Sequence, residues 1–573
     1  MQVRSPRVRS GLTKFRRGPR LASCPGRESE NKKKRHLPPI PGPRAVSAAE
    51  CYGIMPRGGH APQGRNPFLS IPREFPYNRA SPSLGDREPP ALIRITVLLH
   101  ILGQYLLVLA GLLLIPLGLG LSIGEDVRPF VVATAVVALS GGVLLIGARR
   151  PTGNLSQREG ILLVLGIWFA TSFFGCLPFC MSPHFPSFTD AFFEATSGFT
   201  TTGATILADV EVLGLPMQLW RCFTHWFGGM GIVLLGIAIL PLVGMGGMTL
   251  YRAEFSGAKS EKLKPRITET ALALWKIYFT LTLAEYLALR WAGMSIFDAI
   301  CHAFSTMGTG GFSPRTASIA AYGSAAVEGV LIVFMLLAGM NFVLHYRLWV
   351  EHRPRSFLAD IELRYYLMLV VAATVLITAS LALGRTYDVP AAFRHSLFQV
   401  CSIMTTTGFV TADFEAWHSF PQLILLILMF IGGCTGSTAG GMKTSRILML
   451  LRVIGREFKR MVEPKAVFSI RLGSTVFPEY AVQSLLNLVS LALLVNLAAC
   501  LLLAGSGLDP LTSIAAVVAC MFNIGPGLGG VGPIDNYGGL PALAKWVLST
   551  CMLAGRLEFY TVFIILTPAF WRD

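Results

Sequence analysis

Four short segments of this chain are rich in threonine or asparagine and in glycine, and each ends in a glycine that an apolar residue follows directly. Glycine tolerates backbone angles, including positive φ, that turn carbonyl oxygens toward a common axis. Four such loops around one axis would offer carbonyl oxygens to a dehydrated cation, which is the arrangement of a potassium filter. Here one polypeptide would supply all four. The segments are Thr200-Thr201-Thr202-Gly203-Ala204, Thr309-Gly310-Gly311-Phe312, Thr405-Thr406-Thr407-Gly408-Phe409 and Asn523-Ile524-Gly525-Pro526-Gly527-Leu528.

The stretches that precede the four glycines have equal length. The walls of a ring must reach its axis at equal depth, so a common length supports a ring of four and selects Gly311 over Gly310 as the second wall residue. On the same alignment Pro526 replaces a threonine, which makes the predicted ring only pseudo-fourfold. The aligned stretches are AFFEATSGFTTTG, AICHAFSTMGTGG, SLFQVCSIMTTTG and AAVVACMFNIGPG, ending at Gly203, Gly311, Gly408 and Gly527.

These segments are the predicted potassium-binding filter, and no other metal site is predicted. The alternative is a set of small-residue packing motifs between membrane helices, but four matches at equivalent positions favour a pore. No ring of Asp or Glu lies in the segments, which disfavours a divalent-cation channel. Asp190, Glu194 and Asp298 precede the filters, either as a negative mouth or as solvated helix-start residues. The predicted filter residues are Thr201, Thr202, Gly203, Thr309, Gly310, Gly311, Thr406, Thr407, Gly408, Asn523, Ile524, Gly525, Pro526 and Gly527.

The composition indicates a membrane protein. Of the 573 residues, 53% are hydrophobic and only 14% are charged, whereas soluble proteins carry about 25% charged residues. The net charge of +17 suggests a nucleic-acid partner at first sight. However, residues 1–90 hold 18 Lys or Arg against 6 Asp or Glu, so most of the excess is confined to that segment. No nucleic-acid partner is predicted for the protein.

Residues 1–90 are too rich in Arg, Pro and Gly to bury an apolar core, and we expect them to be disordered. Three interpretations of this segment stay open: a basic tail near anionic lipid, a nucleic-acid arm, or sequence upstream of the true start. We expect the functional protein to begin near residue 90.

A spanning helix needs about 20 apolar residues, and ten long apolar segments follow residue 90. Shorter amphipathic stretches lead into the filter segments between spans three and four, five and six, seven and eight, and nine and ten. The expected fold is an all-α polytopic membrane protein with four pseudo-symmetric helix–pore loop–helix repeats around a central pore, preceded by two extra transmembrane helices. The expected spans are 94–122, 129–148, 158–180, 218–243, 268–292, 326–350, 363–384, 420–455, 477–505 and 541–570. The expected divisions are 1–90 for the basic extension, 91–152 for the leading helices, and 153–250, 251–355, 356–465 and 466–573 for the repeats.

Positive charge sets the expected orientation in the membrane. Lys and Arg concentrate in the loops opposite the filters, and the stretch from Lys443 to Arg471 alone holds eight of them against Glu457 and Glu463. We therefore expect filters that open outward and N- and C-termini in the cytoplasm. Docking of a cytosolic partner would explain the basic loops about as well.

Several longer phrases closely resemble the TrkH branch of the Trk/Ktr/HKT potassium transporters, in order over residues 92–573. The resemblance implies an ion-conducting subunit for potassium uptake across the bacterial inner membrane, usually a homodimer. It also implies gating by a cytosolic nucleotide-binding subunit of the TrkA type, so nucleotide is expected on that partner and no cofactor on this chain. The phrases are GGMGIVLLGIAILPLVGMGGM (228–248), STMGTGGFSP (305–314), TTTGFVTADF (405–414), GGCTGSTAGGMKTSR (432–446), NIGPGLGGVGP (523–533) and AGRLEFYTVFIIL (554–566).

A glycine-rich run interrupts the 420–455 segment, and each glycine weakens a helix by up to about 1 kcal/mol. The run predicts a broken helix whose loop enters the cavity beneath the filter; the alternative is a kink that permits close helix packing. The resemblance gives this loop the role of an intramembrane gate. The predicted gating residues are Gly432, Gly433, Thr435, Gly436, Ser437, Gly440, Gly441, Lys443 and, from the last span, Arg556.

Arg556 lies near the middle of the last predicted span, where a charge costs at least about 2.5 kcal/mol on insertion scales. If it faces the cavity, it would repel cations below the filter when the gate is closed, and the resemblance supports this role. The alternative is a structural ion pair with Glu558 or Glu285.

Rival functions have less support. A sodium-permeable or proton-coupled relative would be expected to lose a filter glycine, and all four segments keep one. A potassium-pump subunit would need a separate ATPase. We do not expect an enzyme, because His225, His302 and His395 stand singly and no Cys-x-x-Cys pair occurs. Channel-like flow and proton coupling both stay open.

Overall fold

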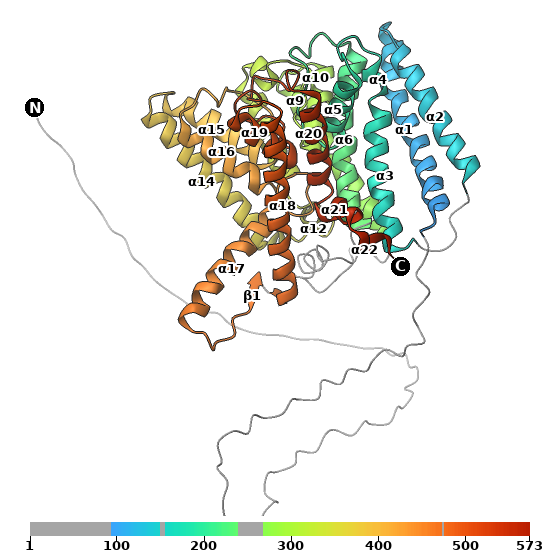
Figure 1. The fold of residues 1–573 in the computed structure, drawn as a ribbon. Helices are drawn as coiled ribbons and strands as arrows, with labels where there is room; N and C mark the ends of the chain where they lie inside the picture. The colour runs from blue at the N-terminus through green and yellow to red at the C-terminus, as the bar shows by residue number, and fades with distance from the viewer. Residues whose placement is uncertain (1–92, 149–154, 239–266, 473–474, 573) are drawn as a thin grey trace, which may run out of the picture. The chain divides into compact units, whose positions relative to one another are not determined.

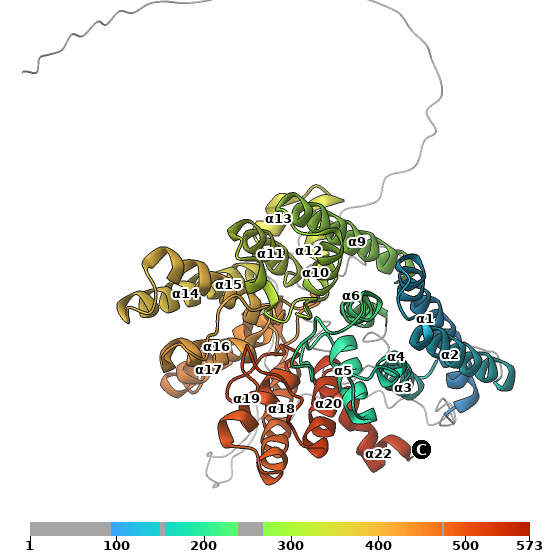
Figure 2. The same cartoon turned by 90° about the horizontal axis from the view of Figure 1, so that it is seen from above.

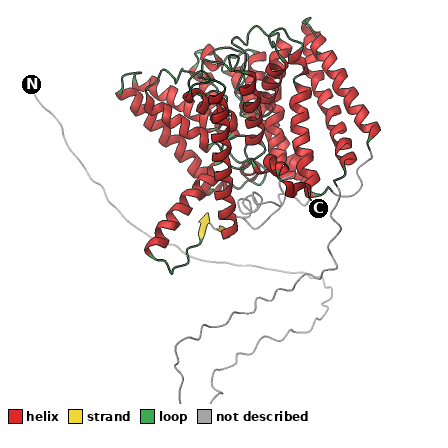
Figure 3. Ribbon diagram, viewed as in Figure 1, coloured by secondary structure: helices red, strands yellow, loops and turns green. Residues whose placement is uncertain are grey.

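The computed structural model describes residues 93–148, 155–238, 267–472 and 475–572, all within one compact unit, Leu84–Asp573. This part consists of helices and loops apart from one antiparallel hairpin, β1 (Ile470–Leu472) with β2 (Thr475–Phe477) (Figure 3). The predicted basic extension and the predicted boundaries at 90, 152 and 250 lie outside the described residues.

Six of the ten expected spans form single helices of membrane length. Within the described ranges, six helices are long and apolar enough to cross a bilayer, or up to eight spans if each of two bent helix pairs counts as one. The prediction of a polytopic helical membrane protein is therefore confirmed. The six are α1 (Ile95–Ile123), α2 (Arg128–Gly147), α3 (Gln157–Gly175) continued by α4 (Leu177–Cys180), α9 (Ile267–Trp291), α14 (Ile361–Leu383) and α18 (Glu479–Gly505).

Two segments expected to be single spans are bent. The first forms α11 (Ala325–Ala338) and α12 (Phe342–Trp349), which meet at 99°, because Asn341 begins a new helix by accepting the N–H of Val343 at 2.9 Å. The last segment forms α20 (Ala542–Arg556) and α21 (Tyr560–Phe563) with η2 (Ile564–Leu566), at 114°. Between α20 and α21, Glu558 has φ of 57°, which an α-helix does not use.

The predicted helix break in the 420–455 segment is present. α16 (Ser419–Ile431) and α17 (Thr444–Val462) lie on either side of the glycine-rich run. The buried side chains of α17 include Met449 and Val453, which pack with the β1–β2 hairpin and α18. Figure 1 shows α17 and β1 projecting from one end of the bundle. The 218–243 segment forms α6 (Leu215–Ala238), and the rest of it lies outside the described residues.

Four short helices precede the filter segments: α5 (Phe188–Phe199), α10 (Ile296–Gly308), α15 (Val389–Met404) and α19 (Pro510–Met521). Their 12 to 16 residues extend about 18–24 Å, less than the roughly 30 Å of a bilayer core. Side-chain caps fix three of their starts, because Ser187, Ser295 and Asp509 each accept a backbone N–H from the first turn.

Seen from above, the helices follow one another around a centre in chain order (Figure 2). The pair α5 and α6 is followed by α9 to α11, then α14 to α16, then α18 to α20, while α1 and α2 lie outside. Helix α20 packs against α5, so the end of the chain meets the first short helix. The four filter segments, far apart in sequence, are thereby brought to one place.

Candidate cation site

The four filter segments share one backbone conformation. In each, two residues with positive φ stand on either side of a middle residue: the first has φ of 54° to 55°, and the second is a glycine with φ of 81° to 96°. The middle residue donates its N–H to the carbonyl five positions earlier, at 2.8 or 2.9 Å. The first positions are Thr201, Thr309, Thr406 and Asn523; the middle positions are Thr202, Gly310, Thr407 and Ile524; the glycines are Gly203, Gly311, Gly408 and Gly525.

The expectation that Gly527 is the fourth wall glycine is wrong by two residues. Gly525 holds the positive φ, whereas the N–H of Gly527 bonds the carbonyl of Val531 at 2.7 Å within its own loop. Pro526 consequently does not replace a threonine; it follows the glycine, and Ile524 takes the middle position. The sequence alignment does not distinguish Gly525 from Gly527, because both positions are glycine. The start of the preceding short helix does not fix which of them aligns with the other wall glycines.

The middle carbonyls and the glycines close a ring. Each wall glycine lies against the middle carbonyl of the next segment: the first against the second, the second against the third, the third against the fourth, and the fourth against the first. Real Cβ atoms do not approach carbonyls this closely, so only glycine fits at these positions. A Cβ on Gly203 would lie 2.0 Å from the Gly310 oxygen, on Gly311 2.1 Å from that of Thr407, on Gly408 2.0 Å from that of Ile524, and on Gly525 2.7 Å from that of Thr202.

A histidine explains the glycine pair of the second segment. A Cβ on Gly310 would lie 2.3 Å from Nδ1 of His225, so the imidazole occupies the space that a threonine side chain would need. The same Nδ1 accepts the N–H of Phe312 at 3.3 Å, and the two rings stack with centroids 4.1 Å apart. His225, which stands singly in the sequence, is thus a buried side chain that packs against the second filter segment and holds it in place.

Threonine and asparagine side chains form hydrogen bonds within and between the segments. The hydroxyls of Thr200 and Thr202 lie 2.8 Å apart, and those of Thr405 and Thr407 lie 2.7 Å apart. In the fourth segment, Asn523 donates its amide to the Thr202 hydroxyl at 2.9 Å and to the Met552 carbonyl at 3.1 Å. Asn523 therefore joins the fourth segment to the first.

Glu194 is not a free charge at the mouth. Its Oε1 accepts from Nε of Arg221 at 2.8 Å, and both side chains are almost fully buried. The other carboxylate oxygen accepts the N–H of Ile206 at 3.0 Å, just beyond the first filter segment. The Arg221 guanidinium also lies 4.1 Å from the centroid of the Phe312 ring. This buried pair connects the first and second filter segments.

The other two carboxylates at the short helices are paired as well. Nζ of Lys545 lies 2.6 Å from Asp190, both nearly buried, and Arg315 lies 3.1 Å from Asp298. Of the two expectations for these residues, neither an unpaired negative mouth nor solvated helix starts describes the structure. The carboxylates join α5 to α20 and α10 to its own loop.

Loops on the cavity side of the ring connect neighbouring repeats. The Thr316 hydroxyl donates to Asp209 at 2.5 Å, which lowers the pKa of that exposed carboxyl. Glu415 accepts the N–H of Gly529, and its partial burial raises the pKa of the Glu415 carboxyl. The N–H of Tyr537 bonds the Thr205 carbonyl at 2.8 Å. These contacts join repeats one and two, three and four, and four and one.

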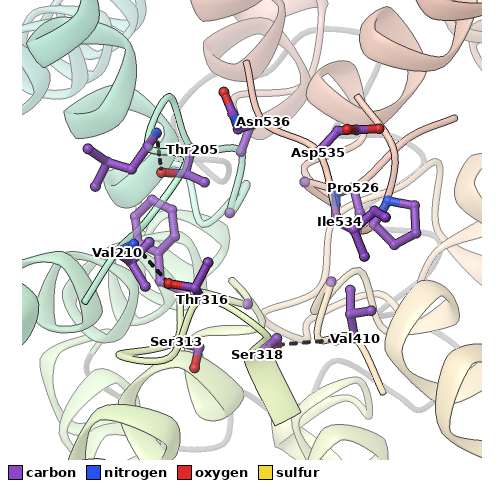
Figure 4. Close-up of a pocket in the computed structure, with 18 of the residues that line it drawn as sticks. Thr205, Val210, Ser313, Thr316, Ser318, Val410, Pro526, Ile534, Asp535 and Asn536 are labelled. Atoms are coloured by element: carbon purple, nitrogen blue, oxygen red, sulfur yellow. Dashed lines mark hydrogen bonds between the residues drawn. The ribbon is translucent and has the colours of Figure 1, made fainter. Parts of the chain in front are cut away.

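Above the ring lies a cavity of about 110 Å³ that all four wall glycines help to line. Figure 4 shows its polar side chains, among them Thr205, Thr316, Asp535 and Asn536, arriving from different repeats around the opening. The oxygen ring is thus reached through a polar chamber.

On the other side of the ring, the loop between α16 and α17 passes directly under the third and fourth filter segments. The Gly440 N–H donates to the Thr406 hydroxyl at 2.6 Å, and the Gly441 N–H donates to the Phe522 carbonyl at 3.1 Å. A Cβ on Gly440 would lie 2.2 Å from the Phe522 oxygen. The predicted gating loop therefore touches the predicted filter.

Several groups hold this loop in place. Oε1 of Glu362 on α14 accepts the N–H groups of Thr435 and Ser445, at 2.6 and 3.2 Å, at the loop's two ends. The Gly436 carbonyl accepts from the N–H of Phe342 at 3.0 Å, and Lys443 Nζ donates to the Ala439 carbonyl. Glu362 was not among the predicted site residues, although a Glu at the start of an apolar span is a usable signal.

Arg556 lies against the loop and is 3% exposed. Its guanidinium donates to the Thr438 carbonyl at 2.8 Å, and among the described residues it makes no ion pair. Glu558, one partner considered for it, is instead 2.8 Å from Arg446 at the start of α17. The structural ion-pair alternative for Arg556 is thus not what the contacts show.

Long apolar helices, bent helix pairs and four short helices that deliver loops to a buried oxygen ring define a polytopic helical membrane protein with re-entrant segments. A family model described as "TrkH: Cation transport protein" matches residues 129–572. The chain belongs to this TrkH cation transport family.

Similar proteins support this membership along nearly the whole described chain. The chain is 41% identical over 479 residues to the Trk system potassium uptake protein TrkH of Salmonella typhimurium, covering 83% of this chain and 99% of that protein. It is 40% identical to the protein of the same name from Escherichia coli K12, with the same coverage. The crystal structure of the potassium transporter TrkH from Vibrio parahaemolyticus matches with a TM-score of 0.77 and 38% identity, over 84% of this chain and all of that one.

Proposed function

We propose that this chain is the potassium-selective, ion-conducting subunit of an uptake system in the bacterial inner membrane. The observation that carries the proposal is the closed ring of four middle carbonyls, one from each re-entrant segment, fixed by four glycine contacts. Carbonyl rings replace the hydration shell of potassium in filters. The similar proteins named above are described as potassium uptake proteins.

The electrostatics of the ring suit a monovalent cation. Each short helix ends at its filter segment and aims the negative end of its dipole there. The nearby carboxylates of Asp190, Glu194 and Asp298 are ion-paired, so they do not form the charged ring that a divalent-cation pore uses.

The loop from Gly432 to Lys443 is the proposed gate. It lies in contact with the filter segments, and Arg556 adds a buried positive charge at the same level. A cation leaving the filter on this side would meet both the loop backbone and the guanidinium. Conduction would require the loop to move away from Phe522 and Thr406.

The proposal includes a cytosolic nucleotide-binding regulatory subunit and a homodimer, with both termini in the cytoplasm. The support for the regulatory subunit is the basic helix α17, which carries Arg452, Arg456 and Arg460 and projects from one end of the bundle (Figure 1). Because α17 starts where the loop ends, a partner that moves α17 would move the loop. No nucleotide and no nucleic acid are proposed for this chain itself.

Complementation of a potassium-uptake-deficient bacterium tests the proposal. We expect this chain, expressed with a regulatory subunit, to restore growth at low external potassium. The matched control is Gly203→Val, whose added atoms would collide with the Gly310 carbonyl and block rescue. A correctly inserted chain that fails to rescue with its regulator, or a Gly203→Val variant that rescues equally well, would contradict the proposal.

A further inference from the structure

A tyrosine holds one carbonyl of the fourth filter segment. The hydroxyl of Tyr537 donates to the carbonyl of Gly525 at 2.7 Å, and the Tyr537 side chain is 3% exposed. This distance is the usual length of a strong O–H···O hydrogen bond. Gly525 is the wall glycine of its segment, and both residues line the cavity above the ring.

Tyr537 is itself held by the first repeat. Its N–H donates to the Thr205 carbonyl at 2.8 Å, and its ring packs against Phe193 of α5 with centroids 5.5 Å apart. The next residue, Gly538, accepts from Nζ of Lys545 at 2.8 Å, the same amine that pairs with Asp190. The hydroxyl therefore reaches Gly525 from a support fixed on both sides.

The fourth segment differs from the others at this position. Gly525 has φ of 96°, whereas the wall glycines of the first three segments have 81° to 83°. A Cβ on Gly525 would lie 2.7 Å from the neighbouring carbonyl oxygen, against 2.0 to 2.1 Å at the other three. In the part of the chain that the structure describes, no hydrogen bond reaches the carbonyls of Gly203, Gly311 or Gly408.

We propose that Tyr537 is a positioning residue that withdraws the Gly525 carbonyl from ion coordination, so that the cavity end of the filter is a three-carbonyl site. This inference rests on the proposed function. A carbonyl oxygen that accepts a hydrogen bond from a hydroxyl has less electron density to offer a cation and is kept from turning toward it. Because cation preference depends on the number and field strength of carbonyl ligands, Tyr537 weakens the site at which ions enter or leave.

The first test is Tyr537→Phe, which removes one oxygen and keeps the ring against Phe193. With the carbonyl free, we expect the KM for potassium uptake to fall about two- to tenfold, the equivalent of one net hydrogen bond. The potassium-over-sodium preference should rise with it, while the maximal rate changes little. The matched control is Tyr105→Phe on α1, which removes a partly buried hydroxyl that lies 2.6 Å from the Thr171 hydroxyl on α3, and it should leave both quantities unchanged.

The second test keeps the side-chain volume. Replacing Tyr537 with 3-fluorotyrosine makes the hydroxyl a stronger donor, so we expect the opposite result, a higher KM and a lower potassium preference. A purely structural role would not move the two variants in opposite directions. Unchanged KM and preference in both variants, or a shift in the same direction in both, would overturn the inference. Both measurements require potassium uptake by the unmodified chain, so failure of the proposed function is seen separately.

Discussion

The wall glycines are required by contacts between segments. Each of them faces a carbonyl of another repeat at a separation that no Cβ allows, and each also has positive φ. The sequence predicted three of these positions, because threonine and glycine precede an apolar residue there. It included Gly525 in the filter but gave the wall position to Gly527, because the choice depends on which glycine meets the Thr202 backbone, and that contact joins residues more than 300 positions apart.

Gly408→Ser is expected to admit sodium. The added Cβ would lie 2.0 Å from the Ile524 oxygen and 2.9 Å from Cδ of Pro526, so the fourth middle carbonyl must move out of the ring. Loss of one well-placed ligand should reduce the potassium-over-sodium preference by about tenfold, or roughly 1.4 kcal/mol. Competition of sodium with rubidium uptake in cells measures this preference.

Gly527→Ala is the matched variant for the same assay. Gly527 has no positive φ, and its added methyl would meet the side chain of Val531 at 3.0 Å and the Ala515 carbonyl at 3.2 Å, not a ring carbonyl. We expect the wild-type preference. If Gly527→Ala lost selectivity and Gly408→Ser kept it, the register of the fourth segment described above would be refuted.

At the scale of elements, hydropathy and segment length predicted where most helices lie. Local capping contacts determine where they begin, end and bend. The sequence did not predict the two bends at Asn341 and Glu558. The hydropathy of an apolar run is the same whether it forms one straight helix or two helices that meet at a bend. The glycine run in the 420–455 segment was recognised as a break. Its anchors were not, because Glu362 and Phe342 reach the loop from other elements.

Arg556→Ala is expected to raise basal flux in the absence of a regulatory subunit. The variant removes the hydrogen bond to Thr438 and a buried positive charge beside the loop, so cations meet a lower barrier. Rubidium flux into liposomes that contain the purified protein measures the effect, and we expect an increase of several-fold. Arg556→Lys keeps the charge and should stay nearer to the wild type; equal flux in all three proteins would remove Arg556 from the gate.

Glu362→Ala is expected to loosen the same loop and to lower stability. It leaves the buried N–H groups of Thr435 and Ser445 without their acceptor, at a cost of about 1 to 3 kcal/mol each. Thermal unfolding of the detergent-purified protein measures the loss. Glu362→Gln retains one carbonyl oxygen and should lose less, so an equal drop for both variants would argue against the backbone contacts as the cause.

At the scale of the whole described unit, the ring closes because the last repeat is joined to the first. Lys545 of α20 pairs with Asp190 of α5, and the N–H of Tyr537 bonds Thr205. The sequence predicted four repeats but contains no local signal for this closure, since the partners lie in the first and the last of the predicted repeats. The packing of α20 on α5 supplies it.

Lys545→Met is expected to destabilise the protein by about 3 to 5 kcal/mol, because it leaves the Asp190 carboxylate buried and unpaired. The double variant Asp190→Asn with Lys545→Met should recover most of this loss, which a double-mutant cycle of unfolding free energies measures. Additive losses in the cycle would mean that the pair does not couple the two repeats.

The closed ring of four segments has a consequence for how the proposed pore can change by mutation. In a ring of four identical subunits, one altered codon changes every wall at once, and a small shift in coordination is repeated four times. Here each wall has its own codons. Among the described residues, His225 supports the second segment and the Tyr537 hydroxyl bonds the fourth. A single substitution can therefore tune one quarter of the oxygen ring while the other three quarters keep their chemistry.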